Sequence, residues 1–200
     1  MKSYFFLCLI LLSPIITWGQ KLQPGYYDGG LYLAVDSFNH RLTGYFDQSS
    51  GWDEELKCPK FSCIFFIEGI VKADTVRIAT YYPDSRGEDL IYGTLKIIDE
   101  KSVSIQLDED HGGCWNVQIF KTEPISFQLE QAANWNCIRY VTKPKAYFYA
   151  EKKKDKRRKT YIVQNDFICI DQLDNEWAHG YFYSDKTTEG WLRLSDLNTP

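Results

Sequence analysis

The sequence predicts an all-β protein, in which an eight-stranded antiparallel barrel or sandwich is followed by a small β-barrel. Its 200 residues include 14 Tyr, 12 Phe and 6 Trp but one Met, and aromatic side chains are enriched in strands. Apolar and polar residues alternate over many short segments, which indicates strands with one buried face. Clusters of Gly, Asn, Asp and Ser separate these segments, as turns between strands require.

Residues 1–19 have the pattern of a secretory signal peptide. A positive charge precedes an almost wholly apolar run at 4–16, and Thr17 and Gly19 are small residues two positions apart, as at a signal-peptidase site. We therefore expect cleavage before Gln20 and an exported protein, either periplasmic or secreted. The apolar run is shorter than the roughly 20 residues of a membrane span, so no transmembrane anchor is expected after cleavage.

Residues 20–135 predict eight short strands in succession. Alternation is visible in Leu31, Leu33 and Val35, for example. The predicted strands cover residues 25–35, 41–46, 62–70, 75–81, 90–97, 102–107, 114–120 and 125–129. Eight antiparallel strands can close into an up-and-down barrel, which leaves no exposed edge. A sandwich of two sheets is the alternative arrangement.

The start of this region resembles the opening hairpin of avidin- and lipocalin-like (calycin) barrels. The resemblance is carried by a Gly-Tyr-Tyr sequence at 25–27, by Leu-Tyr-Leu at 31–33 and by Leu-Thr-Gly-Tyr-Phe at 42–46. In those families a strand with Gly and aromatic residues closes the barrel, and the next strand has a Leu-Thr-Gly step. The resemblance implies a calycin-like domain at 20–135, and a small-ligand carrier is one function that this fold allows.

Residues 136–200 are similar to a bacterial SH3-like domain. The similarity lies in the order of elements: a short strand at 138–141, a long loop, a turn at 164–166 before an apolar strand, Trp177 at the start of the next strand, and a final Gly-Trp strand at 190–191. Asn165 replaces the glycine usual in that turn, and it also tolerates positive φ. Leu194 replaces a proline of the family's peptide-binding members outside bacteria, so polyproline recognition is not expected. The resemblance implies a surface that contacts cell-wall peptides.

The two predicted domains differ in charge. Residues 20–135 contain 10 basic and 18 acidic residues, whereas residues 136–200 contain 12 basic and 9 acidic residues. Such asymmetry favours two modules, with the boundary at 128–135. Because no Pro-, Gly- or Ser-rich linker marks this boundary, we expect the two domains to pack together.

An aromatic set in the second domain is the first candidate binding site. Flat rings stack on sugar faces and hold extended peptides at low entropic cost. The set consists of Tyr147, Tyr149, Trp177, Tyr181, Tyr183 and Trp191. Alternatively, Trp177 and Trp191 fill a small core. Tyr149 and Tyr183 are the stronger groove candidates, because strand alternation can turn one Tyr of each pair outward.

A basic run is the second candidate. It consists of Lys152, Lys153, Lys154, Lys156, Arg157, Arg158 and Lys159. Such a run can attract an anionic polymer, and the alternative is a solvated loop between two strands. Aromatic residues are not interleaved within it, so it lacks the stacking platform of single-strand binders. No nucleic-acid partner is therefore expected.

Five cysteines remain after the signal peptide, and an oxidising compartment favours pairing among them. The sequence leaves two pairings open, Cys63 with Cys114 or Cys58 with Cys114. Cys137 and Cys169 occur in strand-like segments, where buried thiols are expected. The cysteine and histidine spacings predict no zinc site.

Two acidic segments, 53–55 and 108–111, are expected to be acidic turns. Adjacent carboxylates at 108–110 do not match the spaced ligands of a calcium loop. Against a basic partner these segments nevertheless matter, because the domain that contains them is strongly acidic. An inhibitor of a basic secreted hydrolase of the lysozyme type, or an immunity protein against one, is therefore the alternative function.

The sequence favours binding over catalysis. It has three histidines, no nucleophile elbow and no glycine-rich phosphate loop, so we expect neither an enzyme nor a cofactor. The favoured function is non-catalytic binding outside the cytoplasm, with the SH3-like module engaging cell-envelope material such as peptidoglycan. The expected partner is a cell-wall peptide or glycan, or a secreted protein.

Overall fold

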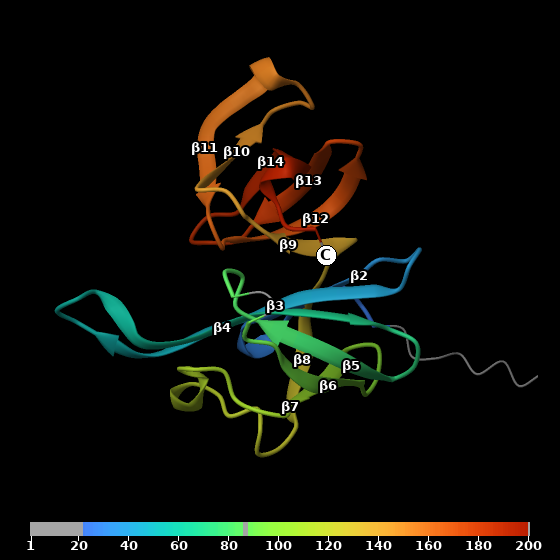
Figure 1. Cartoon of the computed structure of the whole chain (residues 1–200), viewed down its shortest axis with the longest axis vertical. Helices are drawn as coiled ribbons and strands as arrows, with labels where there is room; N and C mark the ends of the chain where they lie inside the picture. The colour runs from blue at the N-terminus through green and yellow to red at the C-terminus, as the bar shows by residue number, and fades with distance from the viewer. Residues whose placement is uncertain (1–21, 86–87, 200) are drawn as a thin grey trace, which may run out of the picture.

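The computed structural model describes residues 22–85 and 88–199 (Figure 1). The predicted signal peptide at 1–19 lies outside the described residues. In the described part of the chain the fold is all-β, with 3₁₀ turns as the helical elements. None of those helical elements is long and apolar enough to cross a membrane.

The first part of the chain forms a closed antiparallel barrel, so the barrel is confirmed and the sandwich is wrong. Its strands are β1 (Gly25–Tyr27), β2 (Leu31–Val35), β3 (Arg41–Asp53), β4 (Cys58–Ile70), β5 (Thr75–Tyr81), β6 (Ile91–Ile97), β7 (Ser102–Leu107) and β8 (Ile125–Ala132). Each strand pairs with the next one in sequence, and β1 pairs with β8 to close the barrel.

Two of the predicted strands are interrupted or absent in the structure. The strand predicted at 25–35 is divided by the 3₁₀ turn η1 (Asp28–Gly30), in which Gly29 has a φ of 64°. The strand predicted at 114–120 is absent, and its first residues form the 3₁₀ turn η2 (Cys114–Asn116). The carbonyl of Cys114 accepts hydrogen bonds from the N–H groups of Val117 and Gln118, at distances of 2.7 and 2.8 Å. These local bonds replace the ladder bonds of a strand.

The hairpin of β3 and β4 is longer than predicted. The pairing between these strands continues to Asp53 and Cys58, well beyond the predicted strands at 41–46 and 62–70. In Figure 1 the distal part of this hairpin projects sideways from the barrel. We call residues 50–61 the arm.

Gly44 allows close contact between β2 and β3. A Cβ atom at this position would lie 2.5 Å from the carbonyl oxygen of Tyr32 and 2.7 Å from Cδ2 of Leu33. A side chain there would therefore collide with backbone as well as side-chain atoms. The Leu-Thr-Gly step of the sequence thus marks a real close approach between two strands.

Large apolar side chains fill the barrel interior. The core includes Tyr27, Leu31, Leu33, Phe46, Phe65, Ile67, Ile78 and Phe120, all almost fully buried. Phe46 contacts Phe120 edge-to-face at 4.9 Å between ring centroids. Such pairs add to the stability that burial alone supplies.

A second sheet follows the barrel. Its strands are β9 (Cys137–Tyr140), β10 (Lys145–Tyr149), β11 (Arg157–Val163), β12 (Phe167–Asp174), β13 (Trp177–Phe182) and β14 (Thr188–Arg193), in the spatial order β11-β10-β14-β13-β12-β9. The 3₁₀ turn η4 (Leu194–Asp196) leads to a bridge between Val141 and Leu197. The sheet encloses its own core of Phe148, Ile162, Ile168, Ile170 and Leu192.

The barrel and the second sheet share a third cluster of buried residues. It joins Ala34, Tyr45, Phe66 and Tyr81 of the barrel to Trp135, Ile138, Tyr140 and Cys169. A buried hydrogen bond of 2.7 Å runs from the N–H of Ile138 to Oγ1 of Thr43. The two parts are therefore packed against each other along β2, β3 and β9 (Figure 1).

Candidate functional site

The outward side of β13 and β14 forms the aromatic face, which we define as Tyr149, Trp177, His179, Tyr181 and Trp191. Alternate residues of β13 point outward, while the intervening Ala178 and Gly180 are buried. On the neighbouring strand, Trp191 pairs with His179, and Tyr149 of β10 pairs with Trp191. Strand alternation thus brings four of the six predicted aromatic residues to one surface.

Ring contacts hold the aromatic face together. Tyr149 meets Trp177 edge-to-face with 4.9 Å between centroids, and His179 meets Trp191 at 5.1 Å. Tyr149 is buried under this contact, so the expectation that it turns outward as a groove residue is wrong, whereas the two tryptophans are half-buried. The tryptophans therefore combine fixed orientation with access from solvent, which a stacking surface requires.

Cations lie over both tryptophans. Lys152 Nζ is 5.0 Å from the Trp191 ring centroid, and the Arg193 guanidinium is 5.6 Å from that of Trp177. Both distances suit cation–π attraction. Lys152 also forms an ion pair with Asp174. The structure thus brings one member of the predicted basic run onto the aromatic face.

A hydrogen-bonded carboxylate orders the centre of this face. The Nδ1 atom of His179 lies 2.9 Å from Oδ1 of Asp171, and the Tyr181 hydroxyl donates to Oδ2 of Asp171 at 3.2 Å. Burial, followed by the nearby Asp171 charge, raises the pKa of Tyr181. His179 and Asp171 were missed by the sequence analysis, although the alternation of Trp177, His179 and Tyr181 places all three on one side of a strand.

The rest of the basic run is divided between a turn and a strand. Residues 152–159 are all exposed, but only the first part is a loop, with the 3₁₀ turn η3 (Lys154–Lys156). Arg157, Arg158 and Lys159 belong to β11, at the edge of the sheet. The interpretation of the whole run as a loop is therefore wrong. Charged side chains on an edge strand also discourage pairing with other chains.

Two predicted aromatic residues lie outside the aromatic face. Tyr147 packs near Tyr161, at 5.5 Å between centroids, beneath the guanidinium of Arg157. Tyr183 lies 5.6 Å from Trp135, at the contact with the barrel. It follows the end of β13, where alternation within the strand no longer determines its direction. Tyr183 is therefore separate from the groove that the sequence predicted.

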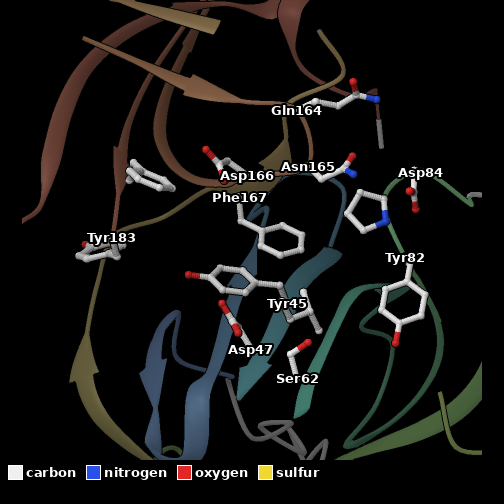
Figure 2. Close-up of a pocket in the computed structure, with 13 residues that line it drawn as sticks. Tyr45, Asp47, Ser62, Tyr82, Asp84, Gln164, Asn165, Asp166, Phe167 and Tyr183 are labelled. Atoms are coloured by element: carbon white, nitrogen blue, oxygen red, sulfur yellow. The ribbon is translucent and has the colours of Figure 1, made fainter. Parts of the chain in front are cut away.

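A cleft between the barrel and the second sheet has a volume of about 440 Å³. Figure 2 shows rings of Tyr45, Phe167 and Tyr183 on one part of its wall and carboxylates of Asp47 and Asp166 near them. This cleft could not be predicted from the sequence, because its two walls come from distant segments. Each wall alone consists of ordinary strand and turn residues.

The cleft is apolar and acidic. Burial raises the pKa of Asp47 and of Asp166, and it raises that of Tyr183 to about 12. Asp166 is also held by a hydrogen bond of 2.8 Å from the N–H of Val163. These groups would favour a cationic over an anionic occupant.

The disulfide joins Cys63 and Cys114, which decides between the two predicted pairings. The exposed Cys58 has a free thiol, so its pairing with Cys114 is wrong. Cys137 and Cys169 are free and buried, as predicted, and burial raises the pKa of both thiols.

The acidic segment at 108–111 is only partly an exposed turn. The carboxylate of Asp108 pairs with Arg77 at 2.5 Å, and Oδ1 of Asp110 accepts the N–H groups of Phe120 and Lys121. His111 is 1% exposed and stacks on Phe65 with 4.9 Å between centroids. The sequence did not predict this burial of His111, which arises because the long loop folds back over the open end of the barrel.

No protein-family model matches the sequence, and neither curated proteins nor solved structures yield a match. The function must therefore be inferred from the site itself. Within residues 22–85 and 88–199, no group of three or more His, Cys, Asp or Glu side chains is arranged to hold a metal ion.

Proposed function

We propose that this chain is a non-catalytic, exported binding protein whose second domain is SH3-like and binds cell-envelope material such as peptidoglycan. The observation that carries the proposal is the aromatic face with its two cations. Trp177 and Trp191 offer half-buried ring surfaces, and Lys152 and Arg193 lie over them. This combination suits a ligand that has both sugar or peptide surfaces and carboxylates.

The order of elements supports an SH3-like second domain. A short strand, β9, is followed by a hairpin, and Asn165 with a φ of 72° forms the turn before the apolar strand β12. Trp177 begins β13, and the Gly190–Trp191 pair lies within β14. These features occur in the order that the resemblance requires.

The proposed mechanism combines stacking and charge. The rings of Trp177 and Trp191 would lie against sugar or peptide surfaces, since such rings gain contact area with little loss of side-chain entropy. Lys152, Arg193 and the exposed basic residues around them would attract ligand carboxylates, and this contribution falls as salt rises. The Cys63–Cys114 disulfide supports an oxidising location.

The filled barrel favours this function over a small-ligand carrier. Tyr27, Phe46, Phe65 and Phe120 are almost fully buried within the barrel core. An eight-stranded barrel can be filled by side chains or can hold one small ligand, and large rings occupy this interior.

Co-sedimentation with purified peptidoglycan sacculi tests the proposal. Residues 20–200 should pellet with sacculi, and the double variant Trp177→Ala/Trp191→Ala should bind about tenfold more weakly, equivalent to ~1.4 kcal/mol. The matched control is Trp52→Ala/Trp115→Ala, which removes two exposed tryptophans from the barrel and should leave binding unchanged. Circular dichroism and melting temperature establish that each variant is folded.

Two results would contradict the proposal. The first is that the wild-type protein fails to pellet at low salt. The second is that the folded Trp177→Ala/Trp191→Ala variant pellets as well as the wild type, since binding would then not involve the aromatic face.

A further inference from the structure

One end of the barrel gathers most of the acidic side chains of the first domain. In an antiparallel barrel every second connection lies at the same end, so the arm shares an end with the β5–β6 loop, described at 82–85 and 88–90, and the β7–β8 loop at 108–124. We call these three segments the acidic end. It is distinct from the aromatic face, which lies on the second sheet (Figure 1).

The acidic end has a strong charge imbalance. The described residues of its three segments include ten of the eighteen acidic residues at 20–135 but three basic residues. Among the acidic residues, Glu54, Glu55 and Glu109 are exposed, and Asp53 is half-buried near the tip of the arm. A surface of one sign attracts partners of the opposite sign and accelerates their association.

Large apolar side chains are exposed among these charges. Trp52 is 59% exposed and Leu56 is 74% exposed on the arm, while Trp115 is 65% exposed on the β7–β8 loop. Phe61 and Ile119 are also exposed. Exposed tryptophan within a charged rim is typical of protein interfaces, where aromatic anchors supply much of the binding energy.

Covalent and hydrogen bonds tie the segments of the acidic end together. The Cys63–Cys114 disulfide joins the base of the arm to the β7–β8 loop. The Ser50 hydroxyl donates to the carbonyl of Asn116 at 3.0 Å, and the Tyr82 hydroxyl donates to the carbonyl of Gly112 at 2.6 Å. A surface held in this way loses little conformational entropy on binding.

We infer that the acidic end docks on a basic secreted protein, with the arm inserted into a cleft of that partner. Charge complementarity selects a positively charged protein surface. The arm is a projecting hairpin (Figure 1), so the partner surface that fits it is concave. The largest cleft of a hydrolase is usually its active site. Docking there blocks substrate entry. This inference uses a different surface from the proposed function and shares with it only the expected export.

Calorimetric titration of residues 20–200 tests the docking. The probes are three basic secreted hydrolases, namely a lysozyme, a ribonuclease and a phospholipase, with an acidic protein of similar mass as the negative control. We expect saturable binding and inhibition for at least one basic probe. The Kd should rise about tenfold when salt is raised from about 20 to about 300 mM, since the Debye length shortens several-fold over that range.

Matched variants assign the surface. Trp52→Ala and the double variant Glu55→Gln/Glu109→Gln should each raise the Kd about tenfold. Their controls are Phe38→Ala, which removes a 96% exposed ring at the opposite end of the barrel, and Glu100→Gln/Glu130→Gln, which changes the net charge equally. Both controls should retain wild-type affinity.

Absence of saturable binding to all three basic probes at low salt would overturn the inference. Equal weakening by the control variants would also overturn it, because attraction would then depend on net charge alone. Binding to sacculi through the aromatic face is unaffected by either result, so failure of one proposal is distinguishable from failure of the other.

Discussion

The ring of Tyr45 in the barrel stacks on the ring of Phe167 in the second sheet, with centroids 4.3 Å apart and planes 9° apart. On its other side Tyr45 stacks on Tyr32, also at 4.3 Å. Tyr45 is therefore enclosed between a neighbour in its own barrel and a residue of the other sheet. This stack is the centre of the contact that holds the two parts of the chain together.

Replacing Tyr45 with alanine should destabilise the whole protein. The side chain is 6% exposed, and removing a buried aromatic ring costs about 3–5 kcal/mol in free energy of unfolding. Urea denaturation followed by tryptophan fluorescence measures this change. Tyr45→Phe keeps both stacking contacts but removes the hydroxyl that hydrogen-bonds with the side chain of Tyr32. It should therefore lose about 1 kcal/mol, the usual contribution of one hydrogen bond.

Tyr92→Ala is the control, because Tyr92 is an aromatic residue on the exposed side of β6. Its loss should cost about 0.5 kcal/mol or less, as is usual for surface positions. A similar loss of stability in Tyr45→Ala and Tyr92→Ala would show that the stack contributes nothing beyond a surface ring.

Stability should fall as the pH decreases from about 6.5 to about 4, because of His111. Burial lowers the pKa of His111 from 6.5 to about 4, although the charges of Asp89 and Asp110 oppose this shift. Between these values the unfolded chain binds a proton that the folded chain does not, so the free energy of unfolding decreases by up to about 3 kcal/mol. Below pH 4 both states are protonated, and this contribution becomes constant.

The geometry explains why His111 stays neutral. Thr80 donates its hydroxyl proton to the carbonyl of Ile91 at 2.9 Å, so it accepts a hydrogen bond from Nε2 of His111 at 2.7 Å. The Nδ1 atom of His111 is buried without a partner. Protonation there would create an unpaired charge in an apolar site.

Chemical denaturation at pH 7, 6, 5 and 4 measures this effect in the wild type, in His111→Phe and in His40→Asn. His111→Phe should lack the decrease, whereas His40→Asn, at an exposed turn position, should retain it. An equally steep decrease in His111→Phe would assign the pH dependence to other groups.

Loss of the Cys63–Cys114 disulfide should lower stability substantially. The bridge joins residues 51 positions apart. In the chain-entropy model, closing a loop of that length lowers the entropy of the unfolded chain and raises the free energy of unfolding by about 4 kcal/mol. Melting temperature with and without reductant, together with the variant Cys63→Ala/Cys114→Ala, measures this contribution.

Cys58→Ser is the control, since Cys58 is an exposed free thiol and its replacement should leave the melting temperature unchanged. Alkylation of the native protein should modify Cys58 alone, because Cys137 and Cys169 are buried. Rapid modification of two or three thiols in the folded protein would contradict this arrangement.

Local patterns predicted much of the barrel but not its irregular parts. The strands at 75–81 and 102–107 have the predicted bounds, since alternation and flanking turns both occur within each segment. The segment at 114–120 contains strand-like apolar residues, yet the disulfide and the left-handed Gly113 turn it into η2. That outcome depends on contact with β4, which is distant in sequence.

The candidate sites show the same division. Alternation along β13 was sufficient to place Trp177 and Tyr181 on one side of a strand, and pairing with β14 added Trp191. Nothing in the local sequence indicated that Tyr183 would turn toward the barrel. The cleft that it helps to line was equally invisible, because Tyr45 and Phe167 are separated by more than half of the chain.

The sequence by itself determined the all-β class, most strand positions and the turn around Asn165. It also reduced the disulfide to two candidate pairings. Only the tertiary structure decided that the barrel closes, that Cys63 pairs with Cys114, that His111 is buried and that the arm extends beyond the barrel. The physical reason is that alternation specifies which side of its own strand a residue faces. It does not specify which distant element covers that side, and burial, pKa and access to a partner all depend on that covering element.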